Sequence, residues 1–504
     1  MQDLAHHFTQ AGDFERSLKY LRRAADNARR VFAHDEALKF LEQARESAEA
    51  LQRDEEIAAV DEQAGDVHDA RGAIPLVIER YEQALARTRA PAARAALKAK
   101  VGNAYVPTGD PRGLAMLTEA VAELDPVTQT DALAHSIALI GRYHHYRAEP
   151  RKAVEYLERA LELALPQDDV ATLTDIYSYL AGAHHHLIQY DESNRCARLC
   201  IALGERRNFP AAVAIGNEFL SENAMGRGFW DEAIAFAQRN RETGRAIGSM
   251  ARVAWGGFGL TAALYGKGLL QEARTEALAT LQLALQIGEN RLMTWLDPSL
   301  AMIAVDLGDD TAATVHAERG WQRAQALDQK ALTGWALIAR WHVALQTGDA
   351  AAALEWQARY LALVAGTENR VVKLVGLARA AEVSVATERY DEAERVAAEA
   401  LAVAEAGGSP HYRAMAQAAQ GRIALARGDH AAAAASLDAA LATLATTGSA
   451  LDEARSRVHR AAVHRAVHEL DQAQAEATRA RNAFARLDAA HDRARAETFL
   501  ADPG

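Results

Sequence analysis

The chain of 504 residues lacks the features on which several protein classes depend. Its two cysteines, Cys196 and Cys200, are too few for a disulfide framework, and their spacing places both on one face of a helix. Apolar residues nowhere alternate over a stretch long enough to build a sheet. No apolar run approaches the roughly 18 residues of a membrane span, and the first ten residues lack the apolar core of a signal peptide. We therefore expect a cytoplasmic protein that is built of helices and has no membrane segment.

Catalytic and metal-binding motifs are missing as well. A phosphate-binding loop needs a glycine five residues before a Gly-Lys pair, but the pair Gly266–Lys267 has Thr261 at that place. The sequence also has no Gly-x-Ser-x-Gly elbow, no His-Glu-x-x-His and no paired Cys-x-x-Cys. We therefore expect neither catalytic residues nor a cofactor nor a bound metal in this chain, which leaves open that an enzyme is attached to it.

The charge distribution argues against nucleic acid as a direct partner. The formal net charge is -12, and acidic and basic residues are interspersed, whereas a protein that binds a phosphate backbone concentrates positive charge. The one basic concentration comprises Arg16, Lys19, Arg22, Arg23, Arg29 and Arg30. It is either an exposed helix face or a docking face for something N-terminal to it.

What the sequence has in abundance is alanine, the best helix former, arranged with a period of 40 residues. One position just after an inter-helix turn is small in every repeat: Ala33, Ala73, Gly113, Ala153, Ser193, Ala233, Ala273, Ala313, Ala353, Ala393, Ala433 and Ala473. The register holds from Ala153 to Ala473 without an insertion. A small side chain there lets the second helix of a repeat lie against the first.

Turn signals recur around the same position, among them "QAGDFERS", "YGKGLLQEA", "DLGDDTAA" and "ARGDHAAA". Glycine relieves the backbone at the end of one helix, and aspartate or a neighbour caps the next helix. Each repeat is therefore predicted to consist of a first helix (helix A), a short turn, a second helix (helix B) and another short turn.

These repeats resemble the tetratricopeptide repeat (TPR) family. The best single unit carries the family's marks in order: Val101, Gly102, Tyr105, Gly109–Asp110 and Asp125–Pro126. The units are longer than the usual length of about 34 residues, which longer helices would explain. The resemblance covers essentially the whole chain. It implies an all-α fold, a right-handed α-solenoid of about twelve helix-turn-helix repeats, with A helices lining a concave groove and B helices on the convex face.

The first 45 residues or so carry a second resemblance. They are similar to the junction segment behind the nucleotide-binding part of large bacterial signalling ATPases, a class that includes MalT-like transcription activators and multidomain class III adenylate cyclases. The matching residues are Leu4, Ala5, His7, Ala11, Gly12, Asp13, Tyr20, Leu21, Ala24, Ala25, Ala28, Glu36, Ala37, Leu41, Glu42 and Ala44. The resemblance implies that the chain is the sensor and scaffold part of a larger protein with an N-terminal ATPase domain, or a protein that lost that domain.

Consecutive histidines mark two A helices, in "GRYHHYRAEP" and "SYLAGAHHHLIQYDES". By the family's pattern, six side chains of this region face the groove: Asn103, Arg142, His145, Tyr146, His185 and His186. They line a polar groove without a ligand, or they dock an acidic peptide or small anion with Arg142 as the donor. Consecutive helical residues splay by about 100° each, so the three histidines cannot share one metal ion. Metal binding between repeats is a third alternative.

Trp255, Trp295 and Trp335 recur at intervals of 40, near the start of three successive A helices. Stacked repeats would arrange them as a ladder. Because tryptophan is costly to expose and its N–H needs a partner, inter-repeat packing is one interpretation. The other is an aromatic strip in the groove for a sugar-like ligand or an apolar peptide.

Together these features predict a noncatalytic TPR scaffold and sensor with a junction repeat region at residues 1–50, a superhelix at 51–488 and a capping helix at 489–504. We expect it to bind a protein or peptide partner, or a small-molecule effector, as the regulatory part of a signalling ATPase or transcriptional regulator. The alternatives are a free-standing adaptor between proteins and the TPR portion of an adenylate cyclase.

Overall fold

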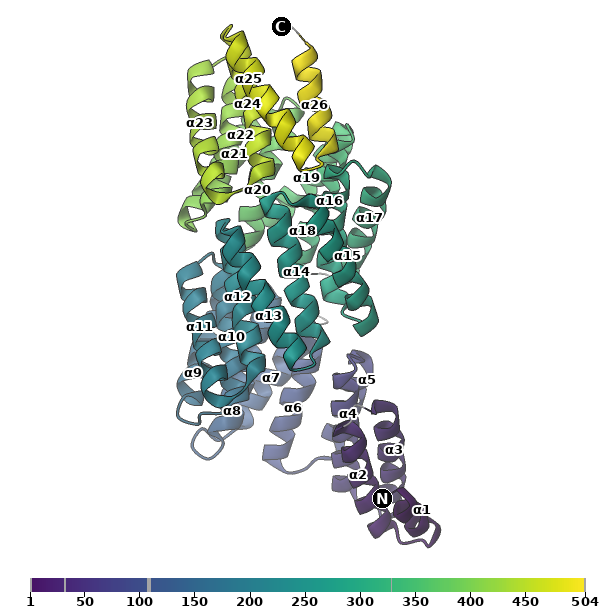
Figure 1. Ribbon diagram of the computed structural model, residues 1–504. Coiled ribbons are helices and arrows are strands. Elements are labelled where there is room, and N and C mark those ends of the chain that lie inside the picture. Colours follow the sequence, from purple (N-terminus) through teal and green to yellow (C-terminus); the bar gives the residue numbers. More distant parts are fainter. Residues whose placement is uncertain (1, 31–32, 107–109, 328, 503–504) are drawn as a thin grey trace. The chain divides into compact units, whose positions relative to one another are not determined.

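The computed structural model describes residues 2–30, 33–106, 110–327 and 329–502, which form 26 helices and no strand (Figure 1). The predicted all-α class is therefore confirmed. Gly109 of the predicted Gly-Asp turn lies outside the described residues. None of the described helices combines the length and the apolar character that a membrane span requires.

The helices pair as A and B helices around short turns. α1 (Gln2–Gln10) precedes the first pair, and α26 (Ala490–Ala501) follows the last. The twelve A helices are α2 (Phe14–Arg30), α4 (Asp54–Ala70), α6 (Pro91–Tyr105), α8 (Thr130–Tyr146), α10 (Val170–His186), α12 (Pro210–Arg227), α14 (Met250–Lys267), α16 (Asn290–Asp306), α18 (Lys330–Gln346), α20 (Arg370–Ala386), α22 (Pro410–Ala426) and α24 (Ala450–Ala466). The twelve B helices are α3 (His34–Ala50), α5 (Ile74–Arg87), α7 (Pro111–Glu123), α9 (Pro150–Ala164), α11 (Tyr190–Arg207), α13 (Trp230–Ala246), α15 (Leu270–Ile287), α17 (Asp310–Leu327), α19 (Ala350–Ala365), α21 (Tyr390–Ala406), α23 (His430–Thr447) and α25 (Leu470–Arg486). The predicted solenoid of about twelve repeats is confirmed.

Helix length explains the period of 40. The helices from α12 to α18 have 17 or 18 residues each, and turns of two or three residues separate those from α12 to α17. A residue with a left-handed backbone stands at nearly every twentieth position, from Ala148 (φ 57°) to Asp488 (φ 57°). More than half of these residues are glycine, which adopts this conformation without strain, but Ile188 and Glu388 are among the exceptions.

The small position lies where helix A and helix B of one repeat touch. All nine of its residues from Ala153 to Ala473 are buried, as predicted. At Gly113 of α7, an added Cβ would lie 3.0 Å from the carbonyl oxygen of Gly102 in α6, so any larger side chain would push the two helices apart.

The predicted series is wrong at its first two members. Ala33 and Ala73 are the N-cap residues of α3 and α5 and are only half-buried. The buried equivalents stand four residues later, at Ala37 and Val77. The unit that runs from Val77 to Gly113 is shorter than 40 residues. Counting back by 40 from Gly113 therefore gives Ala73 and Ala33, the N-cap residues, instead of the buried positions.

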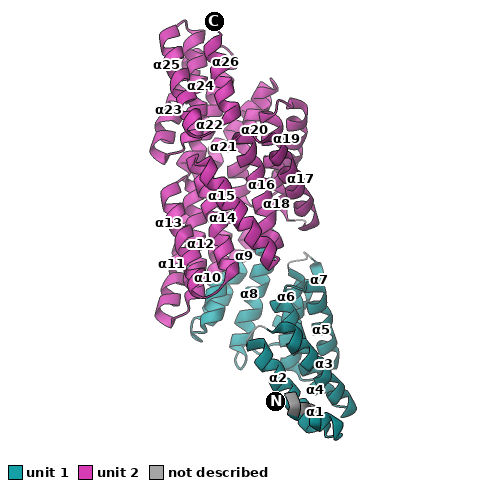
Figure 2. Cartoon of the chain, turned by 45° about the vertical axis from the view of Figure 1, so that its right-hand side comes forward, with its two compact units in different colours: residues 1–147, 155–176 teal, residues 148–154, 177–504 magenta. Residues whose placement is uncertain are grey.

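By their contacts, the residues divide into two compact units (Figure 2). Unit 1 comprises residues 1–147 and 155–176, and unit 2 comprises residues 148–154 and 177–504. The segment boundaries predicted near residues 50 and 488 stay predictions.

Within unit 2 the A helices lie on the inside of the bend. From α12 to α24, each A helix packs on the next A helix, whereas no described B helix packs to a similar extent on the next B helix. A stack of helix pairs curves toward the side on which its helices come closest. We call the surface formed by the A helices of unit 2 the inner face.

Unit 2 also brings together residues that are far apart in the sequence. The indole Nε1 of Trp230 donates to the hydroxyl of Ser449, 219 residues away, at 2.8 Å, and its ring meets His411 edge-on at 5.0 Å. An added Cβ at Gly228 would lie 2.3 Å from the Cβ of His411, so the chain permits no side chain there. α12 contacts α22, α14 contacts α24, and α16 contacts α26. We call this series of contacts the seam.

Candidate functional site

The three predicted tryptophans lie on the inner face of unit 2, one each on α14, α16 and α18. Phe258 of α14 bridges the first two, with ring centroids 6.1 Å from Trp255 and 5.8 Å from Trp295. The centroids of Trp295 and Trp335 are 6.2 Å apart. We call these four rings the aromatic ladder.

The aromatic ladder is packed on one side and part-exposed on the other. Trp335 donates its Nε1 hydrogen to the hydroxyl of Ser299 at 3.2 Å, and the rings border apolar clusters of neighbouring repeats. Each of the three tryptophans still keeps part of its surface exposed. Packing between repeats is therefore present, and the remaining surface is available to a ligand.

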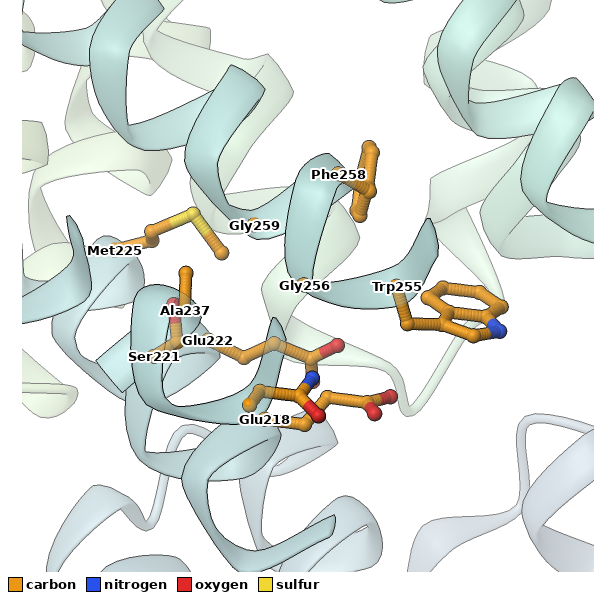
Figure 3. A pocket seen from close by; sticks show the side chains of 10 residues that line it. Glu218, Ser221, Glu222, Met225, Ala237, Trp255, Gly256, Phe258 and Gly259 are labelled. Carbon is orange, nitrogen blue, oxygen red and sulfur yellow. The ribbon is translucent and has the colours of Figure 1, made fainter. Parts of the chain in front are cut away.

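A shallow pocket with an enclosed volume of about 10 Å³ and an open mouth adjoins the N-terminal end of the aromatic ladder (Figure 3). Figure 3 shows Glu218 and Glu222 of α12 on one side, with Trp255 and Phe258 of α14 on the other. Ser221, Met225, Ala237, Asn240, Gly256 and Gly259 complete the lining. The pocket thus combines two carboxyl groups with an aromatic wall.

The two carboxyl groups differ in their partners. Glu218 accepts a hydrogen bond from Arg252 at 2.5 Å and forms an ion pair with it. Glu222 has neither a hydrogen bond nor an ion pair with any described residue. Burial and the nearby Glu218 raise the pKa of Glu222 to about 8, against the opposing effect of Arg291 and Arg252. Glu222 is therefore largely a neutral acid at pH 7.

Asn240 of α13 contributes a second unpaired acceptor. Its side chain is 1% exposed, and its Oδ1 atom accepts no hydrogen bond from the described residues. A buried polar atom without a partner is costly and is uncommon in native proteins. A ligand in the pocket that donates a hydrogen bond would satisfy the Oδ1 atom of Asn240.

The predicted histidines of α10 lie in another part of unit 2. His185 is buried and shares a hydrogen bond of 2.8 Å with the side chain of Asn223, which also donates to Ser193 at 2.8 Å. Burial lowers the pKa of His185 to about 4, so the ring is neutral at physiological pH. His186 is part-exposed, with its ring centroid 6.0 Å from that of His185. A ligand-binding role for either residue stays a prediction.

The remaining predicted residues lie in unit 1. The guanidinium of Arg142 lies 5.6 Å from the centre of the Tyr146 ring, and His145 meets the same ring edge-on at 5.7 Å. Asn103 is part-exposed on α6. α8 therefore brings Arg142, His145 and Tyr146 together, and anion binding by Arg142 stays a prediction.

The basic stretch of α2, also in unit 1, is partly neutralised by the chain itself. Arg22 pairs with Glu56 of α4 at 2.8 Å, and Arg29 lies 3.9 Å from Asp66 of the same helix. Lys19 remains exposed. The stretch therefore serves the packing of α2 on α4 as well as presenting charge.

Beyond α18 the inner face carries cations instead of rings. Continuing the tryptophan position in steps of 40 gives Val375, Met415, Arg455 and Arg495. Arg455 donates to Asp306 and to Asp492, each at 2.7 Å, and the Asp306 side chain is fully buried. His342 also contacts Asp306, at 2.9 Å.

Two further arginines on this part of the inner face lack a close counter-ion among the described residues. The Nε atom of Arg379 is buried without a hydrogen-bond partner among the described residues, and the carboxyl group nearest to Arg422 belongs to Glu382 at 3.9 Å. Burial together with Arg422 and Arg495 lowers the pKa of His459 well below its ordinary value, so this ring is neutral. We call Arg379, Arg422 and the neutral His459 the basic end of the inner face.

Sequence reasoning missed Glu218, Glu222, Asn240 and Phe258. One of them could have been found, because Glu222 stands two steps of 40 after Arg142, at the position predicted to face the groove. Asn240 lies on a B helix, where the family's pattern predicts no groove residue.

Metal ligands do not gather anywhere in the described residues, where no three His, Cys, Asp or Glu side chains are grouped as a metal ion would need. The two cysteines of α11, Cys196 and Cys200, are buried, and the Sγ atom of Cys200 donates to the carbonyl oxygen of Ala212 at 3.4 Å.

No protein-family model matches the chain, and no curated protein matches its sequence. Among solved structures, a Rap protein in complex with Competence and Sporulation Factor is similar, with a TM-score of 0.54 and 13% identity over 70% of this chain and 99% of the Rap chain. A STAND-class signal transduction ATPase with a TPR sensor, from Pyrococcus horikoshii, matches with a TM-score of 0.48 and 15% identity over 71% of this chain and 54% of its own. The helix pairs and the first of these similarities show repeats of the TPR type.

Proposed function

We propose that this chain is a noncatalytic TPR scaffold and sensor that binds a protein or peptide partner at the inner face of unit 2. A small-molecule effector at the same face is the second candidate ligand. The repeats hold side chains at fixed intervals, and they supply surface rather than reacting groups.

The observation that carries this proposal is the aromatic ladder. Exposed aromatic surface is unfavourable in water, and a part-exposed row of tryptophans across three repeats is therefore typical of a binding surface. Aromatic side chains in such rows are common anchors of protein interfaces. The Rap protein of similar fold was solved in a complex, which supports the view that this fold can carry a binding site.

The parent role is a further part of the proposal. The resemblance of residues 4–44 to the junction segment of signalling ATPases favours a regulatory array that reports ligand binding to an attached ATPase or transcriptional regulator. A free-standing adaptor and the TPR portion of an adenylate cyclase are the alternatives. Sequencing the DNA upstream of the Met1 codon separates them, since an open frame with a phosphate-binding loop supports the ATPase parent and an upstream stop codon supports the adaptor.

Selection of random dodecapeptides on phage against the immobilised full chain tests the binding proposal. We expect the selected peptides to lose about tenfold in affinity for Trp295→Ala. The matched control is Trp321→Ala, which removes a part-exposed tryptophan from the B helix α17 and should leave the affinity unchanged.

Circular dichroism shows whether each variant keeps its helices, and Trp255→Leu serves as a second ladder variant if Trp295→Ala unfolds. Peptides that bind ladder and control variants equally well would contradict the proposal. So would a library from which no binder can be selected.

A further inference from the structure

The pocket beside the aromatic ladder has two groups that could accept a hydrogen bond from a ligand. Glu222 forms no hydrogen bond with the described residues, and the Oδ1 atom of Asn240 accepts none. Two donors of the pocket are engaged, because Arg252 donates to Glu218 and the hydroxyl of Ser221 donates to the carbonyl oxygen of Ala233 at 2.9 Å, whereas the Nε atom of Arg241 lacks a partner among the described residues. A ligand that completes the two acceptors must therefore bring hydrogen-bond donors.

The aromatic wall suits a donor that carries positive charge. The faces of tryptophan and phenylalanine rings attract cations, most strongly in places from which water is largely excluded. The ring of Trp255 already has the guanidinium of Arg291 at 5.6 Å from its centre, so this ring tolerates a cation beside it. Phe258 presents a second ring to the same pocket.

The charges around Glu222 come from every helix that lines the pocket or borders it. Glu218 lies on the same helix, Arg252 on α14 and Arg291 on α16, and Arg241 of α13 is paired with Glu276 at 2.9 Å. Glu218 is paired with Arg252, whereas Glu222 forms no ion pair with the described residues and feels Arg291 and Arg252 only from a greater distance. A cation that enters would favour the ionised form of Glu222 and lower its pKa from about 8.

We propose that this pocket binds the guanidinium or ammonium group of a basic side chain from a partner peptide. Glu222 supplies the charge, Asn240 a neutral acceptor, and Trp255 with Phe258 the aromatic wall. The inference rests on the proposed function, since it names the chemistry of the partner that the inner face receives. A peptide, rather than a free amine, fits because the aromatic ladder continues past the pocket to Trp295 and Trp335, which a free amine would leave uncovered.

Calorimetric titration of the full chain at pH 8 with three probes tests the inference. The probes are the blocked pentapeptide Ala-Ala-Arg-Ala-Ala, its analogue with neutral citrulline in place of arginine, and agmatine. We expect the arginine pentapeptide to bind at least about tenfold more tightly than the citrulline analogue, because a charge-assisted hydrogen bond is stronger than a neutral one. We also expect it to bind more tightly than agmatine.

Two variants of the pocket and one control complete the experiment. Glu222→Gln keeps the shape of the side chain and should remove most of the preference for arginine over citrulline. Asn240→Leu should weaken the arginine pentapeptide without harm to folding, because the asparagine makes no hydrogen bond to be lost. The control is Glu242→Gln, which changes an exposed carboxyl group on α13 and should bind as the unmodified chain does.

The outcomes separate this inference from the proposed function. Equal affinities for arginine and citrulline, or unchanged preference in Glu222→Gln, overturn the inference. If the phage selection yields peptides that depend on Trp295 and lack any required basic residue, the proposed function stands and the inference falls. If agmatine binds as tightly as the pentapeptide, the peptide source is overturned. If none of the probes binds, the inference is overturned.

Discussion

From α12 to α18 the inner face of unit 2 carries aromatic rings and the two carboxyl groups of the pocket, whereas from α20 to α26 it carries arginines, of which Arg455 is paired with Asp306 and Arg422 has its nearest carboxyl group at 3.9 Å. The position that is tryptophan in three A helices is arginine at Arg455 of α24 and at Arg495 of the final helix, α26. The backbone is alike in both parts, because the helices from α12 to α18 and from α20 to α25 have 17 or 18 residues each.

This difference shows that repeats with the same backbone can present different binding surfaces. Helix length and turn conformation set where each side chain stands, and the residue at that position decides what the surface can bind. A partner that lies along the inner face would meet aromatic rings and carboxyl groups at one end and arginines at the other. Binding in one direction along the solenoid would thereby be favoured over binding in the reverse direction.

The largest loss of stability is expected in the part from α20 to α26, where Arg455 balances the buried charge of Asp306. Arg455→Leu leaves Asp306, whose side chain is fully buried, without its strongest counter-charge and should lower the free energy of unfolding by about 3 kcal/mol. Arg460→Leu on the same helix removes a cation that pairs with the exposed Asp438 and should cost less than about 1 kcal/mol. Urea unfolding measures both, and equal losses would show that Asp306 does not depend on Arg455.

The next prediction concerns the part from α12 to α18, where Glu222 makes the free energy of unfolding depend on pH. Since the pKa of Glu222 is raised to about 8, folding is penalised as pH rises from the ordinary carboxyl range toward 8, where only the unfolded chain ionises this group. Glu222→Gln should therefore stabilise the protein increasingly as pH rises from 4 toward 8 and leave its stability unchanged near pH 4. Thermal unfolding across this range checks the sign, and Glu242→Gln should show no such change. A uniform gain at all pH values would contradict the prediction.

Two buried asparagines give a smaller but sharper contrast. Asn240→Leu should raise the free energy of unfolding by about 1 kcal/mol, because it replaces an unpaired polar group with an apolar one of similar size. Asn223→Leu should lower it by about 2 kcal/mol, because it leaves His185 and Ser193 without their partner. Calorimetry of both variants tests the pair, and a loss of stability in Asn240→Leu would indicate a hidden partner for that residue.

The smallest effect concerns the basic end. Burial and then the charges of Arg422 and Arg495 lower the pKa of His459, so Arg422→Leu should raise that pKa toward its ordinary value. Titration of the histidine ring by NMR measures the change. Arg427→Leu, which alters an exposed cation on the C-cap of α22, should leave the pKa of His459 where it was. An unchanged pKa in Arg422→Leu would mean that burial alone sets it.

The fold could be predicted because its causes are local and repeat. Helix length and the small residue between helices recur every 40 residues, and most turns show a glycine. The left-handed turn at Ile188 shows no such signal, because its cause is not local. Ile188 is 3% exposed, and its side chain lies against Gly407 across the seam. Tertiary packing there holds a conformation that a β-branched residue otherwise avoids.

The candidate site could be predicted only where it follows the period. The tryptophans stand at one repeated position, which predicts a ladder; the rings of Trp295 and Trp335 meet, whereas Phe258 stands between Trp255 and Trp295. Asn240 stands out instead because no described neighbour donates a hydrogen bond to its Oδ1 atom. A pattern along the sequence cannot predict the absence of such a donor. His185 shows the converse, since a residue that the family's pattern directs to the groove is buried against Asn223.

The seam limits the gain and loss of whole repeats during the evolution of this protein. Repeat arrays commonly lengthen or shorten by whole units, because each unit contacts only its neighbours. Here Trp230 also requires Ser449, 219 residues away. Deleting one unit of 40 residues between them would place Ala489 opposite that indole instead, and the hydrogen bond would be lost. We therefore expect insertions and deletions of whole units to be selected against in unit 2, and its repeat number to be constant among descendants of this gene.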